Sequence, residues 1–297
     1  MHVPVLLNET IKALDPKPGE FFIDGTFGGG GHTASILERM MPTGKFLAVD
    51  WDANSLKENQ SQIEAKFQNS KIQIFWINDN YANLPEILKQ KKLPKADGLL
   101  LDLGFSSEQL ENSDRGFSFK RDEPLIMTYS KASQPVFRLL AVLSEGELEE
   151  ILRKFGEERF AKRIAAAICR KQKSRQPIRT SGELADLVRQ SVPQNYERGR
   201  MDPATRTFQA LRIYANQELE NLETVVRDLE KIIKTNGRVA IISFHSLEDR
   251  IVKNYFRDFS KAGKLKILTK KPIVPGAEEI KVNFRSRSAK LRAAQFN

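Results

Sequence analysis

The fold is decided by one stretch of sequence, Phe21-Phe-Ile-Asp24-Gly-Thr-Phe-Gly-Gly-Gly-Gly-His32. Its first four residues form a short apolar run that ends at a glycine cluster, which is the pattern of a buried strand. The next segment, Thr33–Met40, alternates polar and apolar side chains with a helical period. An acid at a strand end followed by a glycine turn lets the backbone approach a ligand closely. The stretch therefore predicts a strand, a ligand-binding turn and a helix in succession.

Three more apolar runs, with helical patterns between them, extend this unit. The predicted strands are Phe21–Asp24, Lys45–Asp50, Ile72–Ile77 and Gly98–Asp102, and the predicted helices are Thr33–Met40, Leu56–Phe67 and Leu84–Lys91. Apolar strands that are separated by helices form a parallel sheet covered on both faces. We expect an α/β fold with a doubly wound, mostly parallel, Rossmann-like sheet.

An all-helical insertion is predicted to interrupt this sheet. Between Ser106 and Tyr214 helical patterns dominate, and no run resembles the four strands. Capping-box spacings precede two of the expected helices, at Ser144–Glu147 and Thr180–Glu183. The predicted segments are residues 1–108 for the first part of the sheet domain, 109–213 for the helical insertion and 214–297 for the second part with a basic tail.

The return to the sheet follows a long helical pattern. Asp202-Pro203 supplies a helix N-cap followed by proline at the first helical position. The pattern continues from there to Gly237, and an apolar run follows over Gly237–Phe244. We expect a helical stretch that ends at Gly237 and a strand that begins there.

The glycine turn can be compared with known phosphate loops. It has no Lys-Ser or Lys-Thr pair, which disfavours an NTPase, and Thr33 occupies the last position of a G-x-G-x-x-G pattern that Gly28 and Gly30 would begin. A plain strand–helix turn remains the structural alternative. Asp50, however, ends the next strand, nineteen residues after Gly31, where such folds place a carboxylate on ribose hydroxyls. The pair favours a nucleoside ligand.

Two further acids narrow the choice of ligand class. Asp24 and Asp102 both end predicted strands at the carboxyl edge, where open α/β sheets bind ligands. Carboxylates at this edge would repel a pyrophosphate and suit a cationic ligand. S-adenosylmethionine (AdoMet) combines a ribose and an adenine with a sulfonium and a zwitterionic tail, so it fits this edge better than a dinucleotide.

Composition excludes several other classes. The single cysteine, Cys169, allows no intrachain disulfide and suggests a reducing compartment. Three scattered histidines beside it give no metal-ligand spacing, so we expect no metal. Apolar runs are too short to cross a bilayer, and Met1–Glu9 reads neither as a secretion signal nor as an import signal. We expect a cytoplasmic protein with no membrane partner; its oligomeric state stays open.

The positive charge is concentrated in two segments. The chain carries 48 Lys+Arg against 38 Asp+Glu, a formal net charge of +10, and residues 151–180 and 261–297 each hold ten basic and two acidic residues. Solvated surfaces are the simple explanation, but two such runs on an otherwise acidic chain favour nucleic-acid binding. The basic residues that we expect to contact RNA are Lys162, Arg163, Lys171, Lys173, Arg285 and Arg287.

Six blocks of sequence together resemble a known family. They are Asp24–His32, Leu101–Ser107, Arg115–Phe119, Gly156–Ile164, Pro203–Ala210 and Ile242–Arg250. In this order they are similar to the ribosomal small-subunit RNA cytosine-N4 methyltransferase family (RsmH, formerly MraW), and the similarity covers nearly the whole chain. The resemblance implies a class I AdoMet methyltransferase fold, with the helical insertion as the RNA-recognition domain.

The same resemblance implies a reaction and a cofactor site. The reaction is AdoMet-dependent methylation of the exocyclic N4 of one cytosine in the decoding region of 16S ribosomal RNA, in an assembled or assembling small subunit. The implied cofactor contacts are Gly30, Gly31, His32, Asp50, Tyr81, Asp102 and Gln109, and Asp24 joins them as a strand-end acid of the same edge. Of these, Tyr81 and Gln109 rest on the resemblance alone.

Two residues are candidates for a catalytic role. Cytosine N4 is a poor nucleophile because its lone pair is delocalised into the ring, so a positioned acceptor for its proton would assist transfer. Asp102 and the backbone carbonyls after it could serve, although a role for Asp102 in cofactor binding alone is equally open. His245 follows the predicted strand at the same edge; it could contact substrate or simply cap the next helix.

Two alternatives to this enzyme remain. One is a non-catalytic RNA-binding factor in ribosome assembly, and the other is an amino-methyltransferase that acts on another nucleic acid. One segment also departs from the family pattern: Arg121–Tyr129 has Glu123, Ile126 and Thr128 where relatives typically have glycine, aspartate and arginine. The paired loss of an acid and a base suggests that a loop contact has been replaced by apolar packing.

Overall fold

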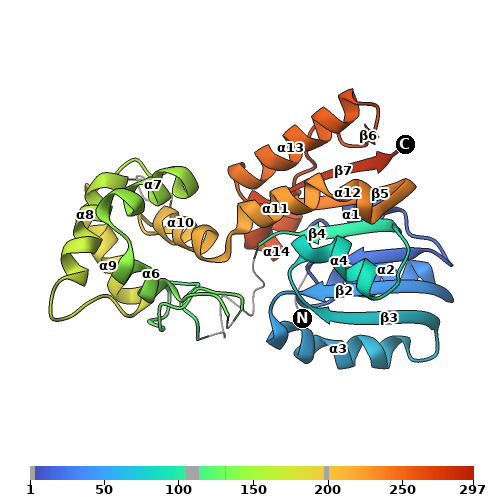
Figure 1. The fold of residues 1–297 in the computed structure, drawn as a ribbon, viewed down its shortest axis with the longest axis horizontal. Helices are drawn as coiled ribbons and strands as arrows, with labels where there is room; N and C mark the ends of the chain where they lie inside the picture. Colours follow the sequence, from blue (N-terminus) through green and yellow to red (C-terminus); the bar gives the residue numbers. More distant parts are fainter. Residues whose placement is uncertain (1–3, 105–113, 131, 197–200) are drawn as a thin grey trace. The chain divides into compact units, whose positions relative to one another are not determined.

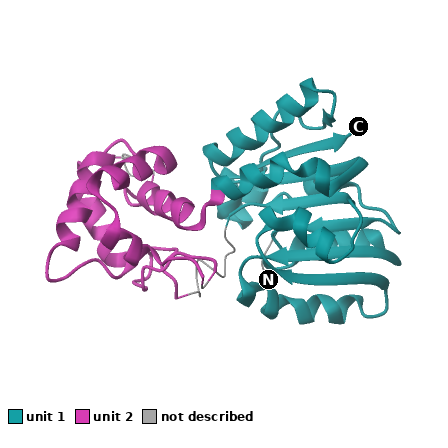
Figure 2. Ribbon diagram, in the orientation of Figure 1, with its two compact units in different colours: residues 1–105, 219–297 teal, residues 106–218 magenta. Residues whose placement is uncertain are grey.

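The computed structural model describes residues 4–104, 114–130, 132–196 and 201–297. The chain divides into two compact units, shown in Figure 2. Unit 1 comprises residues 1–105 and 219–297, and unit 2 comprises residues 106–218. The expected insertion, 109–213, lies within unit 2.

Unit 1 contains a seven-stranded sheet with the order β3-β2-β1-β4-β5-β7-β6 (Figure 1). The strands are β1 Phe21–Asp24, β2 Thr43–Asp50, β3 Lys71–Asn78, β4 Ala96–Asp102, β5 Ile233–Ser243, β6 Leu265–Ile267 and β7 Lys290–Phe296. The pairs from β3 to β5 are parallel, whereas β7 runs antiparallel to both β5 and β6. The strand order reverses between β1 and β4, and this reversal places the crevice of a doubly wound fold at their carboxyl ends.

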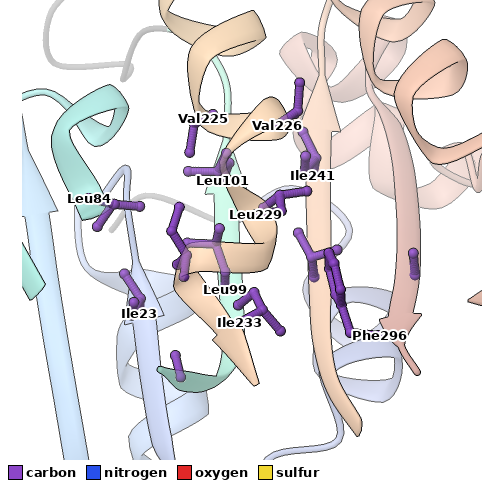
Figure 3. Close-up of a cluster of buried hydrophobic side chains, with 14 of the residues drawn as sticks. Ile23, Leu84, Leu99, Leu101, Val225, Val226, Leu229, Ile233, Ile241 and Phe296 are labelled. Carbon is purple, nitrogen blue, oxygen red and sulfur yellow. The ribbon is translucent and has the colours of Figure 1, made fainter. Parts of the chain in front are cut away.

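Helices cover both faces of the sheet. One face packs against α1 Leu7–Leu14, α2 Gly31–Met40 and α3 Ala53–Phe67, and the other packs against α4 Leu84–Gln90, α11 Glu218–Arg227, α12 Leu229–Ile232 and α13 Ser246–Lys261. Side chains alternate between the two faces of the sheet along each strand. Phe22 and Leu100 therefore pack in the core under α1 to α3, the first core, and Ile23, Leu99 and Leu101 pack in the core on the other face, the second core. Figure 3 shows the second core, where Val225, Leu229 and Ile241 also lie.

Short elements complete unit 1. They are the 3₁₀ helices η1 Tyr81–Asn83 and η3 Phe284–Ser288 and the helix α14 Ala277–Val282. All four strands predicted before residue 103 are confirmed, as are the three helices between them, with bounds that differ by at most three residues. No helix in the described residues is long and apolar enough to cross a bilayer.

Unit 2 is built from helices. They are α6 Val136–Val142, α7 Glu145–Gly156, α8 Ala161–Gln172, α9 Ser181–Ser191 and α10 Thr205–Asn216. Both predicted capping boxes are confirmed: Ser144 and Thr180 accept from the backbone N–H of Glu147 and Glu183, whose side chains accept in return. In the described residues 114–130 and 132–135, before α6, the backbone is irregular, and Pro124 forms an isolated β-bridge with Thr180.

The prediction for residues 202–237 is wrong in two respects. Asp202 forms a turn in which its Oδ1 accepts from Ala204 N at 2.9 Å, and α10 begins only at Thr205. The helix then ends at Asn216, because the buried Asn216 side chain donates to Met127 O at 2.8 Å and Gln217 takes φ +50°. A tertiary contact therefore overrides the continuing helical period.

The fifth strand also begins earlier than predicted. β5 starts at Ile233, which pairs with Ala96, and an irregularity in register precedes the pairing of Gly98 with Arg238. Gly237 lies inside this strand, where a Cβ would be 2.6 Å from Cγ2 of Ile233 and 2.9 Å from Lys234 O. Glycine is therefore required by close packing within the strand and does not mark the strand's beginning.

Candidate functional site

Three aspartates end three adjacent strands of unit 1. Asp24 ends β1, Asp50 ends β2 and Asp102 ends β4, and β1 lies between the other two strands. The sheet thus brings together acids that are 26 and 52 residues apart in sequence. We call this group of three the carboxylate edge. The sequence predicted this grouping from strand ends alone.

Asp24 is the most enclosed of the three. Its side chain is 1% exposed and accepts hydrogen bonds from Thr33 Oγ1 at 2.7 Å and Thr26 N at 3.1 Å. Burial raises its pKa to about 6, and these hydrogen bonds oppose the rise. Asp24 therefore fixes the start of the glycine turn and the first turn of α2, besides contributing negative charge to the carboxylate edge.

Asp50 is held by the main chain. Its Oδ2 accepts from Gly28 N at 2.7 Å and its Oδ1 accepts from Asp52 N at 2.8 Å. Burial raises the pKa of Asp50 to about 6, against the opposing effect of both N–H groups. Each carboxylate oxygen can accept a second bond. The residue is therefore fixed in orientation and retains acceptor capacity for ligand hydroxyls.

Asp102 has the fewest hydrogen bonds to its carboxylate of the three aspartates, counted over the described residues. Its backbone N–H donates to Thr26 Oγ1 at 2.6 Å, and its Oδ2 lies 3.6 Å from Nε2 of His32. Burial, together with the charges of Asp24 and Glu248, raises the pKa of Asp102 well above its usual range. Its buried Oδ1 has no hydrogen-bond partner within the described part of the chain. These features make Asp102 a candidate base.

The glycine turn is held by hydrogen bonds and packs closely against neighbouring residues. Gly28 and Gly30 have φ +51° and +71°, which favour glycine, and Gly28 O accepts from Ser55 Oγ and Asn59 Nδ2. A Cβ on Gly31 would lie 2.3 Å from Cγ of Pro4. Gly31 also begins α2, so backbone N–H groups of the turn lie beside Asp50 and His32.

Two other predicted residues can be placed at or near this edge. Tyr81 begins η1, just after β3, and its ring packs against the core that contains β4. His245 is the N-cap of α13: its Nδ1 accepts from Glu248 N at 3.4 Å, and Glu248 Oε2 accepts from the N–H of Phe244 and of His245. The helix-capping alternative for His245 is therefore shown. Gln109 lies outside the described residues.

Sequence reasoning missed the two threonines that hold the carboxylate edge together. Thr26 accepts from Asp102 N and lies 3.5 Å from Asp24 Oδ1 through the same hydroxyl, and Thr33 donates to Asp24. Their positions, two and nine residues after Asp24, place one in the turn and one in the first turn of the next helix. That spacing after a strand-end acid is a signal that sequence alone could have provided.

The predicted RNA-contacting residues lie in both units. Lys162, Arg163 and Lys173 are exposed and Lys171 is half-buried, all within or beside α8. None of these four has an ion pair with any carboxylate in the described ranges. Arg285 and Arg287 are exposed on η3 of unit 1. We call the four residues of unit 2 the α8 basic face.

The segment that departs from the family pattern is tightly packed. Glu123 is 6% exposed, and its Oε2 accepts from Gly116 N at 2.9 Å. Thr128 is buried, Ile126 is half-buried, and Arg115 donates to Thr128 O at 3.3 Å. Side-chain to backbone hydrogen bonds hold the segment, and the interpretation that apolar packing replaces a charged contact stays a prediction.

The sheet order, the antiparallel β7 and the carboxylate edge define a class I, Rossmann-like methyltransferase fold. The chain belongs to the MraW methylase family, whose sequence profile matches residues 1–297.

Three relatives illustrate this membership, and each is named ribosomal RNA small subunit methyltransferase H. The protein from Syntrophus aciditrophicus is 42% identical over 310 residues, which covers 99% of this chain and 97% of that protein. The protein from Trichlorobacter lovleyi is 43% identical with the same coverage. The protein from Clostridioides difficile is 39% identical and covers 99% of this chain and 98% of that protein.

Proposed function

We propose that this protein transfers the methyl group of AdoMet to the exocyclic N4 of one cytosine in the decoding region of 16S ribosomal RNA. The substrate is RNA in an assembled or assembling small subunit, and the reaction takes place in the cytoplasm. The observation that carries the proposal is the carboxylate edge beside a rigid glycine turn. Membership of a methylase family and the names of the relatives support it.

The residues present suit AdoMet. Asp24, Asp50 and Asp102 make the edge strongly acidic, which disfavours a pyrophosphate and favours a cation. The unpartnered Oδ1 of Asp102 can accept a hydrogen bond from a ligand. The turn from Gly28 to Gly31 lets a ligand approach the backbone closely, since Gly28 and Gly30 have positive φ.

Each element of the edge has a binding role in this proposal. Asp50 accepts from the ribose hydroxyls while Gly28 N and Asp52 N keep its carboxylate in place. Gly30, Gly31 and His32 face the amino-acid part of the cofactor, and Tyr81 flanks the adenine. Gln109 belongs to the site only by resemblance to the family.

Asp102 carries the proton in this proposal. Bound AdoMet supplies an electrophilic methyl group on a sulfonium. A carboxylate with a raised pKa is a stronger base than an ordinary aspartate, so Asp102 can take the proton that N4 loses as the new N–C bond forms. Thr26 holds the backbone of Asp102, and His245 stabilises α13 as its N-cap.

RNA is bound by the cations of the α8 basic face in unit 2. No cation of the α8 basic face has an ion pair among the described residues, so each is available to phosphate. The target base must leave its stack to be methylated, which suits an RNA with unpaired bases.

Two measurements test this function in sequence. Titration calorimetry should show AdoMet binding, and the absence of heat at millimolar cofactor would remove the enzyme and leave a non-catalytic RNA-binding factor. Transfer of labelled methyl to small subunits, naked rRNA and DNA then identifies the substrate. We expect labelling of small subunits at cytosine N4, and preferential labelling of DNA would favour the other amino-methyltransferase. Asp102→Asn should lower the rate of transfer by a much larger factor than it lowers AdoMet affinity.

A further inference from the structure

One aromatic side chain of unit 1 is unusually exposed. Phe284, the first residue of η3, is 65% exposed. Within the described ranges, every other aromatic residue is buried or half-buried. Most aromatic rings in this chain pack in or against a core. Leaving a ring in water forgoes the favourable free energy of burial, so its surroundings indicate what it binds.

The surroundings of Phe284 are cationic. The guanidinium of Arg287 lies 4.6 Å from the ring centroid, as expected for residues three apart in a 3₁₀ helix. Arg285 is exposed between them; residues 281–290 contain four basic residues and no acid, and of these Lys281 pairs with Glu278 and Lys290 with Asp249. One face of the ring is therefore covered by a cation, while the rest of the exposed ring faces solvent.

The backbone beneath the ring is fixed by hydrogen bonds. Asn283 Oδ1 accepts from Arg285 N at 3.2 Å, and the buried Ser286 donates through Oγ to Asn283 O at 2.7 Å. In α14, just before, Glu279 Oε1 accepts from Leu6 N at 2.7 Å. Phe284 is therefore presented on an anchored turn that continues directly into β7, a paired strand of the sheet.

We propose that Phe284, Arg285 and Arg287 form a stacking platform for one unpaired base of RNA. The base stacks on the open face of Phe284, and the two guanidinium groups contact the phosphates on either side. Aromatic rings flanked by cations bind single-stranded nucleic acid in this way, because stacking tolerates any base and phosphates supply affinity. The choice of RNA as partner rests on the function proposed above.

The test is equilibrium binding of a labelled single-stranded RNA 12-mer and of small ribosomal subunits. Phe284→Ala should weaken binding of the 12-mer about tenfold, equivalent to about 1.4 kcal/mol. Phe284→Trp should retain affinity, and Phe284→Leu should lose it, because leucine keeps an apolar surface without a π-face. The matched control is Val282→Ala, at a 75% exposed neighbour, which should change nothing.

Salt dependence and base removal separate stacking from charge. Phe284→Ala should leave the slope of log affinity against log salt unchanged, whereas Arg285→Gln with Arg287→Gln should reduce it by about 1.4. Replacing single nucleotides of the 12-mer by abasic ones should identify a position whose loss costs as much as Phe284→Ala, and the two losses should not add.

The outcomes distinguish this platform from the proposed function. The platform is overturned if Phe284→Ala binds both RNAs as the wild type does, if Phe284→Leu matches wild type, or if the wild type binds neither RNA. It is also overturned if Phe284→Ala lowers the melting temperature, because the ring then packs against protein. Normal RNA binding without methyl transfer would instead reject the proposed function and leave the platform intact.

Discussion

Two charged surfaces of the molecule differ in both sign and exposure. The carboxylate edge of unit 1 is negative and largely buried, whereas the α8 basic face of unit 2 is positive and mostly exposed to solvent. Asp24 is almost fully buried, and hydrogen bonds orient it and Asp50. Lys162, Arg163 and Lys173 are exposed, with no ion pair in the described part of the chain. A buried, oriented charge suits a small ligand of defined shape, whereas exposed cations suit a polyanion whose phosphates they can follow. The two surfaces should therefore respond independently to substitution.

The largest effect is expected from the α8 basic face. Replacing Lys162, Arg163, Lys171 and Lys173 together by glutamine should reduce the slope of log RNA affinity against log salt by about 3 and weaken binding at least a hundredfold at 0.1 M salt. AdoMet affinity should stay unchanged. Filter binding across a salt series measures the first effect, and calorimetry measures the second.

The control has the same change in charge at cations that already have acidic partners in unit 1. These are Lys66, Lys231, Arg257 and Lys264. Their replacement by glutamine should leave most of the salt slope in place. An unchanged slope in the α8 variant would mean that this face is merely solvated.

The second effect separates binding of the cofactor from binding of RNA. Asp50→Ala removes a charged acceptor from two ribose hydroxyls, each bond contributing about 1.5–3 kcal/mol, so AdoMet affinity should fall at least tenfold. RNA affinity should be retained. Because the pKa of Asp50 is about 6, affinity for AdoMet in the wild type should also weaken as pH falls below that value.

The comparison variant is Asp79→Ala, which removes an acid just after β3. Asp79 accepts from Asn80 N and Asn83 Nδ2, and it lies outside the carboxylate edge. Its loss should leave AdoMet binding nearly intact. Equal dissociation constants for wild type and Asp50→Ala would remove Asp50 from the cofactor site.

The third effect is on stability. The pKa of Asp24 is about 6 in the folded chain and 3.8 ordinarily, so the folded state holds this proton more tightly than the unfolded state. Its favourable contribution is therefore full below about pH 4 and is lost as pH rises through 6. Asp24→Asn should raise the free energy of unfolding at pH 7.5 by about 1–3 kcal/mol, because the Thr33 hydroxyl can accept from the new amide.

Denaturant unfolding at pH 5 and pH 7.5 measures this gain, which should shrink at the lower pH. The exposed Asp186→Asn is the control and should show no such dependence. AdoMet affinity of Asp24→Asn should fall. A variant that is no more stable than wild type at pH 7.5 would show that ionised Asp24 carries no cost.

Much of unit 1 could be predicted from sequence because its strands are apolar on both faces. Continuous runs such as Leu99–Leu101 mark strands, and an acid at the end of β1, β2 and β4 marks the carboxyl edge. The capping boxes at Ser144 and Thr180 could be predicted equally well, since the partner of each residue lies three residues further along the chain. Local signals therefore predicted strands β1 to β4 and the positions of the three acids, whereas β6 and β7 were not predicted.

Non-local contacts explain the remaining errors. The break after Asn216 depends on hydrogen bonds to residues almost ninety positions earlier, Met127 and Tyr129. The early start of β5 depends on Ala96 as a pairing partner for Ile233. The bond from Asp102 N to Thr26 Oγ1 spans 76 residues and could not be predicted for the same reason, although the position of Thr26 two residues after Asp24 is a local signal. Sequence periodicity carries no information about such partners.

The smallest effect is expected at His245, which tests whether every titratable group at the sheet edge takes part in chemistry. Asparagine is a good N-cap, so His245→Asn should keep the bond to Glu248 N, leave the free energy of unfolding within about 0.5 kcal/mol and leave kcat within about threefold. His245→Ala should lose about 1 kcal/mol of stability and retain turnover at low temperature. These results would assign the residue to α13 alone. A loss in kcat of more than a hundredfold in His245→Asn, with stability and AdoMet affinity unchanged, would instead place His245 in the reaction beside Asp102.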